Sequence, residues 1–575
     1  MASPACARFL ALCMGLVAAS ENPFEGKSFY VNPQSSDLFA GTLKAATGSE
    51  AANLKAMRDS PTAIWLNAKS QLKGDGPGTL RGILKQAAVK SEFVVFVLYN
   101  LPNRNCNANV SFGEICCKAA EDGACNWEEA EECRNGINEY ETAFIDPIVK
   151  ALQEYDGKVP SAVVVEPDSL ATLATNPESP RCNNTATRSA YSVGVRYAVS
   201  QLAAKAPSTA IYLDAAHGGV LGWEENLNSY MSMLGDIKLP FSKVRGFSTN
   251  VGGYNAVGTQ CPWCPEGPAK NNFCLQGRHP HHECCADPCG LLKQYNFANN
   301  ELNYAAALVT AAKNWLHLDA HVVIDTSRNG VADARKSCSN WCNPSGAGAG
   351  SRPTAKTANA SLVDAYFWIK TPGLSDGCDA KLGDDPDPKC DANCFAKGAK
   401  SNAPQAGKWF EAQAKELAAN ANFDVTAAAP ALDDCPVEPP PGQEDAYSYI
   451  SADGDEQCGG PYKQCGGDYW HGPSCCGGKC KCEEQKHKNW SSWMCKPPKG
   501  EWKCGHQKPF SDQRLYSDAA PVGSVVPARQ ESMALPAVLA VLGTCGCLAV
   551  VQRLRMKAAG REYSELRGRH GETSA

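Results

Sequence analysis

The 575-residue sequence has little that would suit a nucleic-acid partner. Its formal net charge is −6, and no long basic run occurs before the extreme C-terminus. Proteins that bind the phosphate backbone present clustered basic side chains, so we expect no nucleic acid among the partners. We also expect no cofactor and no bound metal, and a monomeric protein.

Apolar runs that could reach a membrane are scarce, and we identify one at each end of the chain. At the N-terminus, Arg8 precedes an apolar run that continues to the small residues Ala18 and Ala19. This order of a basic residue, an apolar run and small residues is typical of a secretory signal peptide, which we assign to residues 1–19.

The second apolar run, residues 534–551, has no charged residue and is followed at once by Arg553, Arg555 and Lys557. Such a stretch just spans a bilayer, which takes about 20 helical residues. We therefore predict a transmembrane helix within 533–551, with a cytoplasmic tail at 552–575 and the bulk of the chain extracellular or lumenal, as in a type I membrane protein. The alternatives are a buried core helix and a cleaved lipid-anchor signal, although the latter normally ends in its apolar tail.

Cysteine is abundant, with 30 in the chain. Apart from two in the leader and two in the C-terminal apolar run, the remaining 26 form an even number, which in an oxidising compartment predicts disulfides. Several lie in two segments, 115–133 and 261–289. The second combines CPWC with HPHHECC, a pattern that also allows a zinc site, although secretion favours disulfides.

Residues 20–434 have the pattern of one α/β domain. Strand-like apolar runs lie at 93–99, 161–167, 210–216, 321–325 and 365–370, and alanine-rich helix-like segments lie at 187–205 and 299–317. Runs this apolar are typical of strands buried on both faces of a parallel sheet or barrel. Beyond this domain we assign a proline-rich acidic linker to 435–457, a cysteine-rich module to 458–504 and a stalk to 505–532.

Polar side chains follow each predicted strand, at the end where α/β barrels place their chemistry. Glu166 and Asp168 follow one run, and Asp214 and His217 follow the next. Carboxylates, a tyrosine and tryptophans at one end of a barrel suit glycoside hydrolysis, which needs a protonated acid and aromatic platforms for sugar rings.

Four motifs in this domain carry a resemblance to a known family: EPDSLATLATN, YLDAAHGG, TNVGGYN and the WCN block with its glycines. From 22–33 to 402–412 the chain resembles glycoside hydrolase family 6, the cellobiohydrolases and endoglucanases. The resemblance implies a distorted β/α barrel and inverting hydrolysis of β-1,4-glucosidic bonds in cellulose or a related β-glucan.

The resemblance also implies roles for individual residues. Asp168 matches the general acid and Asp376 a debated candidate for the base. The other residues matching the reacting centre are Tyr99, Arg104, Asn105, Ser111 and Arg328. Those matching substrate-binding positions are Trp65, Asp214, His217, Trp223, Asn250, Trp341 and Lys370. Two disulfides are implied, Cys106 with Cys182 and Cys342 with Cys394.

One family motif is altered, because the segment from Tyr99 to Cys106 has asparagine at three positions where the family usually has aspartate. Asn105 is the most consequential, since the family's aspartate there helps keep the acid protonated. Losing that charge would lower the pKa of Asp168 by about one unit, or ~1.4 kcal/mol. Further departures are Leu374 for a glutamate, Val220 for a tryptophan and Asn67 for an aspartate. Two hypotheses follow: an anchored cellulase, or a catalytically impaired cellulose-binding or wall-tethering protein.

The segment 462–495 resembles a fungal-type family 1 carbohydrate-binding module through its YKQCGGDYWHGPSCC start. The resemblance implies pairing of Cys465 with Cys482 and of Cys476 with Cys495. It also makes Tyr462, Trp490 and Trp493 candidates for a flat cellulose-binding row. The alternative is that these aromatics form the core of a module too short to have another.

Overall fold

The computed structural model describes residues 22–424, apart from 122–123, 128–129, 263–273, 275–281, 336, 383–384 and 387–388, together with three short strands between 464 and 496. The chain divides into two compact units, Met1–Tyr447 and Ser448–Ala575. Within the described residues, no helix is long and apolar enough to cross a membrane. The predicted signal peptide, linker, stalk, membrane span and tail all lie outside the described residues.

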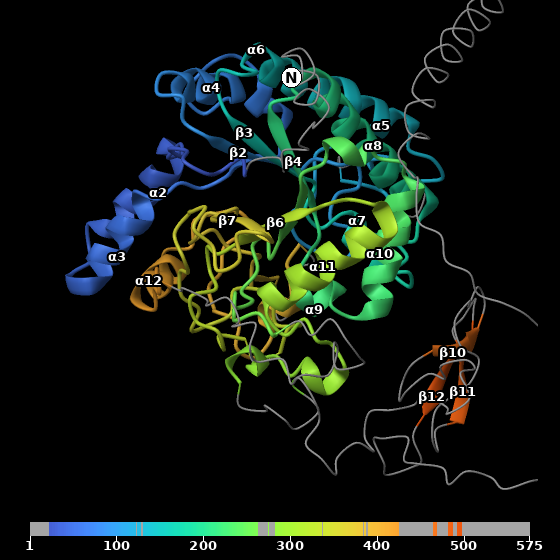
Figure 1. The fold of residues 1–575 in the computed structure, drawn as a ribbon. Coiled ribbons are helices and arrows are strands. Elements are labelled where there is room, and N and C mark those ends of the chain that lie inside the picture. The colour runs from blue at the N-terminus through green and yellow to red at the C-terminus, as the bar shows by residue number, and fades with distance from the viewer. Residues whose placement is uncertain are drawn as a thin grey trace, which may run out of the picture. The chain divides into compact units, whose positions relative to one another are not determined.

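The first unit is built on seven parallel strands in simple chain order (Figure 1). They are β1 Ile64–Leu66, β2 Val94–Leu98, β3 Ser161–Val165, β4 Thr209–Asp214, β5 Gly246–Thr249, β6 His321–Asp325 and β7 Val363–Phe367. All five predicted strand runs are confirmed. The strands β1 and β5 were not among them, because they are only three and four residues long and β5 begins with glycine and contains serine and threonine.

The sheet curls toward a barrel, as the predicted fold requires. Across the seam, the Ala63 N–H donates to the Trp368 carbonyl at 2.9 Å, and the Trp65 indole N–H donates to the Ile369 carbonyl at 2.8 Å. Within the described residues, however, no strand ladder joins β1 to β7. The barrel is therefore distorted: its strands form one continuous sheet that is closed by isolated hydrogen bonds.

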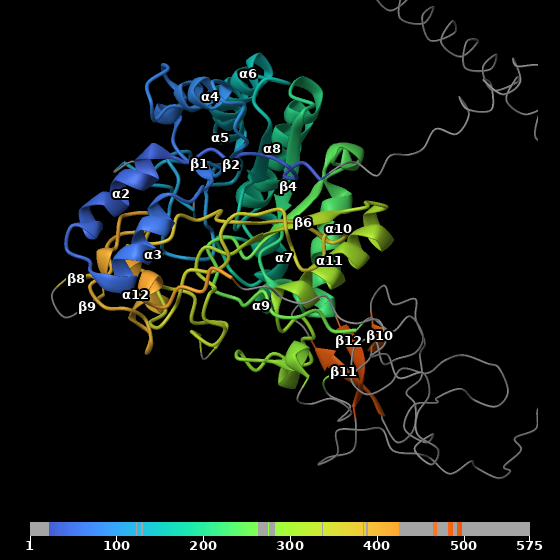
Figure 2. The same cartoon turned by 60° about the vertical axis from the view of Figure 1, so that its left-hand side comes forward.

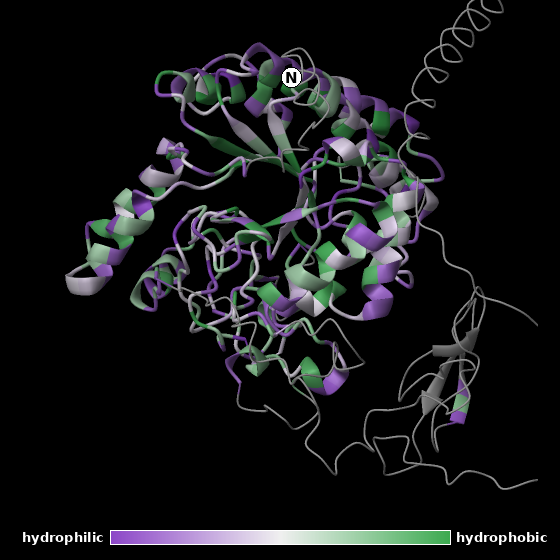
Figure 3. Cartoon of the chain, in the orientation of Figure 1, coloured by the Kyte–Doolittle hydropathy of each residue, from purple (hydrophilic) through white to green (hydrophobic). Residues whose placement is uncertain are grey.

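Helices cover the outer face of the sheet (Figures 1 and 2). These are α4 Leu80–Ala88, α5 Arg134–Glu139, α6 Asp146–Glu154, α7 Leu170–Thr175, α8 Thr185–Lys205, α9 Gly218–Leu221, α10 Glu224–Asp236 and α11 Glu301–Leu316. The helix-like segments 187–205 and 299–317 are confirmed as α8 and α11. These helices carry both apolar and polar residues, as expected when only one face packs on a core (Figure 3).

A second helical group, α2 Pro33–Leu43, α3 Gly48–Arg58 and α12 Glu411–Ala419, packs together at another side of the domain (Figure 2). Phe39, Leu54 and Leu417 are fully buried in its shared core. This cluster also includes Trp368, just after β7. The N- and C-terminal segments of the domain are thereby joined next to the seam of the barrel.

An ion-pair network lies at the N-terminal ends of the strands. The buried Asp364 carboxylate of β7 accepts two hydrogen bonds from Arg245, at 2.7 and 2.8 Å, and one from the Tyr212 hydroxyl of β4 at 2.7 Å. The Asp364 carbonyl also accepts from the Asn22 amide at 2.7 Å. This network connects β4, the start of β5, β7 and the N-terminal segment.

Eight disulfides occur among the described cysteines. Both pairs implied by the family resemblance, Cys106–Cys182 and Cys342–Cys394, are present. The remaining pairs are Cys116–Cys125, Cys117–Cys133, Cys261–Cys284, Cys274–Cys285, Cys289–Cys338 and Cys378–Cys390. In the segment where zinc was the alternative, four sulfurs lie within 4.8 Å of one another as two disulfides, which leaves those sulfurs without the thiolate form that zinc needs.

The second unit contains an antiparallel sheet of β10 Gln464–Gly467, β12 Ser491–Lys496 and β11 Lys481–Lys486, in that order. Cys482 and Cys495 lie directly opposite each other on β11 and β12. Tyr462, Trp490 and Cys476 lie outside the described residues, as do the side chains of Trp493, Cys465 and Cys495. The predicted pairing and binding row of this module therefore stay predictions.

Candidate active site

The predicted site residues converge at the C-terminal ends of the strands. Several of them have a left-handed backbone conformation, with positive φ, which residues other than glycine rarely adopt. Asn105, Ser111, Glu166, Asp168 and Asn250 all have φ between 49° and 65°. Left-handed conformations at non-glycine residues cost energy and gather at functional sites. Their concentration at this edge of the sheet marks it as the place where chemistry is expected.

Asp168 follows β3, and its side chain is accessible to solvent. Its backbone N–H donates to the Asp214 carboxylate at 3.3 Å, which ties the end of β3 to the end of β4. The surrounding protein excludes enough bulk water to raise the pKa of Asp168. The Lys370 ammonium opposes this rise and the Asp376 carboxylate adds to it. An accessible carboxyl with a raised pKa is suited to donate a proton.

Two further carboxyls near Asp168 are buried. Burial also raises the pKa of Asp214 well above its ordinary value, and the neighbouring Asp168 adds to the effect. Glu166, two residues before the acid, accepts from the Tyr140 hydroxyl at 2.8 Å and from the Asn100 N–H at 3.0 Å. Burial raises the pKa of Glu166 to about 7 in spite of these donors. Glu166 is turned into the protein and fixes the chain on which Asp168 is carried.

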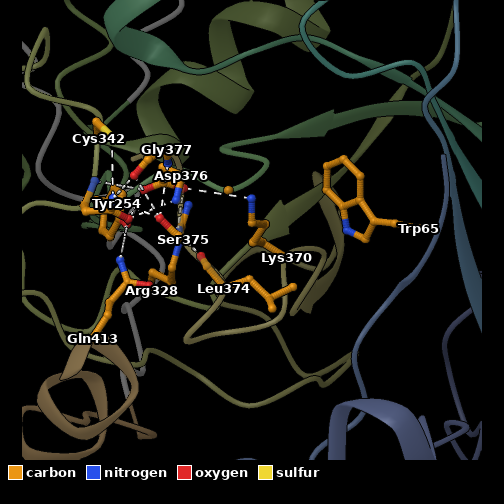
Figure 4. A network of polar contacts seen from close by, with 12 residues as sticks. Trp65, Tyr254, Arg328, Cys342, Lys370, Leu374, Ser375, Asp376, Gly377 and Gln413 are labelled. Atoms are coloured by element: carbon orange, nitrogen blue, oxygen red, sulfur yellow. Dashed lines mark hydrogen bonds and ion pairs between the residues drawn. The ribbon is translucent and has the colours of Figure 1, made fainter. Parts of the chain in front are cut away.

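Asp376 lies in a dense polar network after β7 (Figure 4). One oxygen accepts from the Arg328 guanidinium at 2.7 Å and is 3.9 Å from the Lys370 ammonium. The other accepts from the Tyr254 hydroxyl at 2.6 Å and from the Asn343 N–H at 3.0 Å. Only 8% of the Asp376 side chain is exposed. Its carboxylate is therefore committed to partners from three separate loops.

An aromatic wall stands beside these charges. The rings of Trp65 on β1 and Tyr99 after β2 meet edge to face, with centroids 5.2 Å apart. The Lys370 ammonium is 5.7 Å from the Trp65 ring, and Figure 4 shows it directed toward Asp376, with Trp65 on its other side. The Arg104 guanidinium lies 4.2 Å from the Tyr99 ring. This combination of ring faces and hydrogen-bond donors is the surface that a sugar unit requires.

Arg104 and Asn105 both hold the segment 107–113, which we call the Ser111 loop. Arg104 donates to the Ser111 carbonyl at 2.8 Å and to the Phe112 carbonyl at 3.0 Å. The Asn105 amide donates to the Val110 carbonyl at 2.6 Å. Of these predicted catalytic residues, the structure thus shows Arg104 and Asn105 binding the main chain of the loop that carries Ser111.

His217 belongs to a buried polar group after β4. Its Nδ1 accepts from the Gly219 N–H at 3.1 Å and lies 2.9 Å from the Asn255 amide nitrogen. The same amide donates to the Glu301 carboxylate at 2.9 Å. Burial lowers the pKa of His217 to about 3, so the ring is neutral, and because Nδ1 accepts, its proton is on Nε2.

The other predicted substrate-binding residues differ in their exposure to solvent. Trp223 and Trp341 are partly exposed, and the Trp223 indole donates to the Gln294 carbonyl at 3.1 Å. Asn250, by contrast, is fully buried and hydrogen-bonds the Asn255 backbone and the Asp325 carbonyl. Its contacts organise the loop after β5.

Sequence reasoning did not assign roles to several residues that complete the site. Asn343 and Gln413 support the Asp376 network, since the Gln413 amide donates to both the Tyr254 hydroxyl and the Asn343 side chain at 3.1 Å. Glu301, at the start of α11, supports the loop after β4. The feature that marks these residues as part of the site is their burial, and burial cannot be read from a single sequence.

A surface hollow lined by Leu80, Arg81, Asp146 and Lys150 lies on the helical layer and contains none of the predicted site residues. The strand ends, where the predicted residues converge, are therefore the candidate active site. A curled parallel α/β barrel with a raised-pKa carboxyl, a second carboxylate in an ion network and an aromatic wall has the architecture of a glycoside hydrolase.

The particular family follows from comparison with known proteins. The chain belongs to "Glycosyl hydrolases family 6", whose family pattern matches residues 24–421. It is similar to Exoglucanase 3 of Agaricus bisporus, at 32% identity over 70% of this chain and 79% of that one. It is also similar to 1,4-beta-D-glucan cellobiohydrolase C of Emericella nidulans, at 35% identity over 70% and 79%.

Solved structures agree with this assignment. The catalytic core domain of a cellobiohydrolase from Chaetomium thermophilum matches with a TM-score of 0.55 and 30% identity, over 70% of this chain and 99% of that one. A glycoside hydrolase family 6 enzyme from Coprinopsis cinerea matches with a TM-score of 0.55 and 28% identity, over 70% and 98%. The predicted family membership is confirmed.

Proposed function

We propose that the protein hydrolyses β-1,4-glucosidic bonds in cellulose or a related β-glucan, with inversion at the anomeric carbon and Asp168 as the general acid. The observation that carries this proposal is the environment of Asp168: a solvent-accessible carboxyl after β3 whose pKa is raised by the surrounding protein. The names of its relatives, exoglucanase and cellobiohydrolase, support the same reaction and substrate.

In this mechanism the Asp168 carboxyl protonates the leaving oxygen as the glycosidic C–O bond breaks, while a water molecule forms the new C–O bond on the opposite face of the sugar. The proton that this water loses passes to neighbouring solvent water, and solvent returns a proton to Asp168 after the leaving chain departs. The aromatic wall of Trp65 and Tyr99 packs on the sugar rings, and Lys370 between Trp65 and Asp376 donates to their hydroxyls. The Ser111 loop carries the hydroxyl that holds the attacking water.

We assign Asp376 an electrostatic rather than a basic role. Its oxygens already accept from Arg328, Tyr254 and Asn343, so few lone pairs are left for a water proton. With Leu374 in place of the family's glutamate, Asp376 is also the carboxylate within reach of both Arg328 and Lys370. Its charge holds these two cations in place for the sugar hydroxyls and offsets their repulsion of the developing oxocarbenium ion.

We further propose that the enzyme acts on chain ends. The Asn109 N–H in the loop after β2 donates to the Asp391 carboxylate in the segment after β7 at 3.0 Å. A side chain added to Gly377 would come within 2.8 Å of Val110, so these two loops are in close contact. A bridge between the loops after β2 and β7 favours a substrate that enters by threading, as expected for a cellobiohydrolase.

A second candidate function is a cellulose-binding protein without activity, which Asn105 favours because asparagine supplies no charge to keep Asp168 protonated. Burial supports the first candidate, since it raises the pKa of Asp168 without that charge.

We propose that the protein works at the cell surface or in a lumenal compartment, anchored by residues 533–551. The eight disulfides among the described cysteines support an oxidising compartment. We also propose that the second unit binds cellulose through Tyr462, Trp490 and Trp493. An antiparallel three-stranded sheet is consistent with a module of that kind.

The experiment is an assay of the purified full-length protein on cellohexaose, with the products separated and the newly formed anomer identified by NMR. We expect shorter cellooligosaccharides whose new reducing end appears first as the α-anomer. Binding of cellohexaose without any product would support the second candidate and overturn the first. A β-anomer would overturn inversion alone.

A further inference from the structure

We propose that Asn105 is a positioning residue that latches the Ser111 loop in place, so that the asparagine is an adaptation of this site rather than a damaged aspartate. The inference rests on the proposed function, because it concerns the loop that presents Ser111 to the reaction. It assigns Asn105 a role that depends on its amide nitrogen, which an aspartate lacks.

The contact that defines the latch is the 2.6 Å hydrogen bond from the Asn105 amide to the Val110 carbonyl. Amide nitrogen and oxygen are hard to distinguish by shape, but here the partner decides. A carbonyl can only accept, so the amide nitrogen must face it. Asn105 is 7% exposed, which shields this bond from competing water, and its backbone is held at φ 65°.

Four other contacts hold the same loop. Arg104 binds the carbonyls of Ser111 and Phe112 at 2.8 and 3.0 Å, and the Arg181 guanidinium approaches the Ala108 carbonyl at 3.4 Å. The Asn109 N–H donates to Asp391 at 3.0 Å.

As a result, each of the five consecutive residues 108–112 has its main chain hydrogen-bonded by a side chain from elsewhere. Arg104 and Arg181 together donate to three of these carbonyls. The Asp391 carboxylate accepts from the Asn109 N–H, and the Asn105 amide donates to the central carbonyl, that of Val110. A loop without helix or strand structure is thereby fixed at the position next to Ser111.

An ionised aspartate at position 105 would reverse the central contact. Two oxygen acceptors would face each other where the amide now donates at 2.6 Å, and the loop would have to move away. A protonated aspartate, in contrast, has an O–H that can donate to the Val110 carbonyl. The latch therefore predicts that an aspartate functions here only when it carries a proton.

Other charged groups near the loop do not change this expectation. Arg104 and Arg181 remain cationic, and the Asp391 carboxylate is held by the Asn109 N–H and by the Asn393 backbone and amide. Burial raises the pKa of Tyr191, whose hydroxyl donates to the Asn103 carbonyl at 2.7 Å, so it stays neutral. An ionised aspartate at position 105 would raise the pKa of Asp168 and so favour the variant at higher pH, which is the opposite of the fall in activity that the latch predicts.

The two accounts of Asn105 predict opposite results for Asn105→Asp. If the position needs a charge, the variant gains activity and its pH optimum rises. If the position is a latch, kcat/KM at pH 7 falls by about 10- to 100-fold, since displacing a loop by about 1 Å at the reacting centre can cost that much. The ratio of variant to parent then recovers as the pH falls to about 4.5, near the ordinary pKa of a carboxyl.

The test uses the full-length protein and two readouts, cellohexaose turnover across pH and hydrogen exchange of the peptide covering 107–113. Relative to the parent at the same pH, we expect Asn105→Asp to lose protection of the Asn109 amide at pH 7 but much less at pH 4.5. We also expect kcat to change more than KM. Asn138→Asp makes the same chemical change at an exposed position of α5 and should alter neither readout. Asn105→Ala removes the amide donor without adding a charge. It should raise exchange of the loop at both pH values, and it serves if Asn105→Asp does not fold.

Unchanged exchange in the Asn105→Asp loop, or activity above the parent at pH 7, would overturn the latch. If Asn105→Asp does not fold, unchanged loop exchange in Asn105→Ala overturns it instead. Hydrogen exchange can be measured in a protein without activity, so the latch and the proposed hydrolase activity are tested independently. A parent without activity but with a pH-dependent loop in Asn105→Asp would refute the hydrolase and keep the latch.

Discussion

At the scale of single residues, the protonation of Asp168 depends on a balance between burial and charge. Exclusion of bulk water by the surrounding protein raises the pKa of this accessible carboxyl, Asp376 raises it further, and Lys370 is the neighbour that lowers it. Since Asn105 contributes no charge, Lys370 becomes the residue through which this balance can be changed with least disturbance of the backbone. A general acid works only while protonated, so its pKa sets the alkaline limit of activity.

We predict that Lys370→Met shifts the alkaline limb of the kcat profile to higher pH. The positive charge of the Lys370 ammonium stabilises the ionised form of Asp168. Without it the pKa of Asp168 rises, so the acid keeps its proton to a higher pH. KM should rise as well, because Lys370 lies between Trp65 and Asp376. Turnover of cellohexaose between pH 4 and 9 measures the shift.

Lys85→Met is the control, since Lys85 is exposed on α4 and should leave the profile in place. A limb that stays fixed or moves to lower pH in Lys370→Met would contradict the assignment of Asp168 as the group titrating there.

The prediction that Asp168 is the acid comes from the sequence alone, because its motif has a recognisable order of residues, and it stays a prediction. The sequence did not predict what Asn105 does. The partner of the Asn105 amide is a backbone carbonyl whose position depends on Arg104, Arg181 and Asp391 together. No local pattern encodes such a set of long-range contacts.

At the scale of elements, the barrel is held at its two ends by different means. The C-terminal ends carry the site and its strained backbone, whereas the N-terminal ends are joined by the pair of Arg245 and Asp364. The Asp364 side chain is fully buried and Arg245 is only 11% exposed. A buried charge left without its partner is strongly destabilising.

We predict that Asp364→Ala lowers the free energy of unfolding by about 3–5 kcal/mol, because Arg245 would remain buried without its counter-ion. Asp59→Ala removes an exposed pair with Lys55 and Arg58 and should cost less than about 1 kcal/mol. Urea unfolding followed by tryptophan fluorescence measures both. Equal losses in the two variants would show that the Arg245–Asp364 pair does not hold the strands together.

Long apolar elements were predictable and short ones were not. The strands β2, β3, β4, β6 and β7 follow from runs of buried residues, and α8 and α11 from alanine-rich segments. β1 has only three residues, and its place depends on the hydrogen bonds that Ala63 and Trp65 make across the seam. Such contacts join positions about 300 residues apart, which periodicity cannot detect.

At the scale of the whole molecule, the chain divides into two units that we expect to share the work on an insoluble substrate. In the proposed function, the barrel cleaves the chain and the second unit holds the protein on the polymer. Attachment to a surface raises the effective concentration of the enzyme there without new contacts at the active site.

We predict that the double variant Trp490→Ala and Trp493→Ala weakens binding to microcrystalline cellulose by about tenfold or more, since stacked aromatics dominate such surfaces. Hydrolysis of soluble cellohexaose should stay unchanged. Trp315→Ala is the matched control, because Trp315 is 51% exposed on α11 and belongs to the other unit. Co-sedimentation with cellulose measures the effect, and equal losses in the two proteins would contradict a binding role for the module.

The division into units could be anticipated from composition, because a proline-rich acidic stretch separates a globular pattern from a cysteine-dense one. The membrane span and signal peptide remain predictions from hydropathy and flanking charge. The cysteine pairs of the insertions were beyond reach, since pairing depends on distances between loops that are separated by up to 49 residues, as for Cys289 and Cys338.

The central claim is that Asp168 supplies the proton to the leaving group, and a leaving group that needs no proton tests it most directly. The measurement compares the parent protein and Asp168→Asn on cellohexaose and on 2,4-dinitrophenyl β-cellobioside. We predict that Asp168→Asn loses about 10²- to 10⁴-fold in kcat on cellohexaose and retains most of its activity on the dinitrophenyl substrate. Equal losses on both substrates, or no loss on either, would contradict the assignment of Asp168 as the acid.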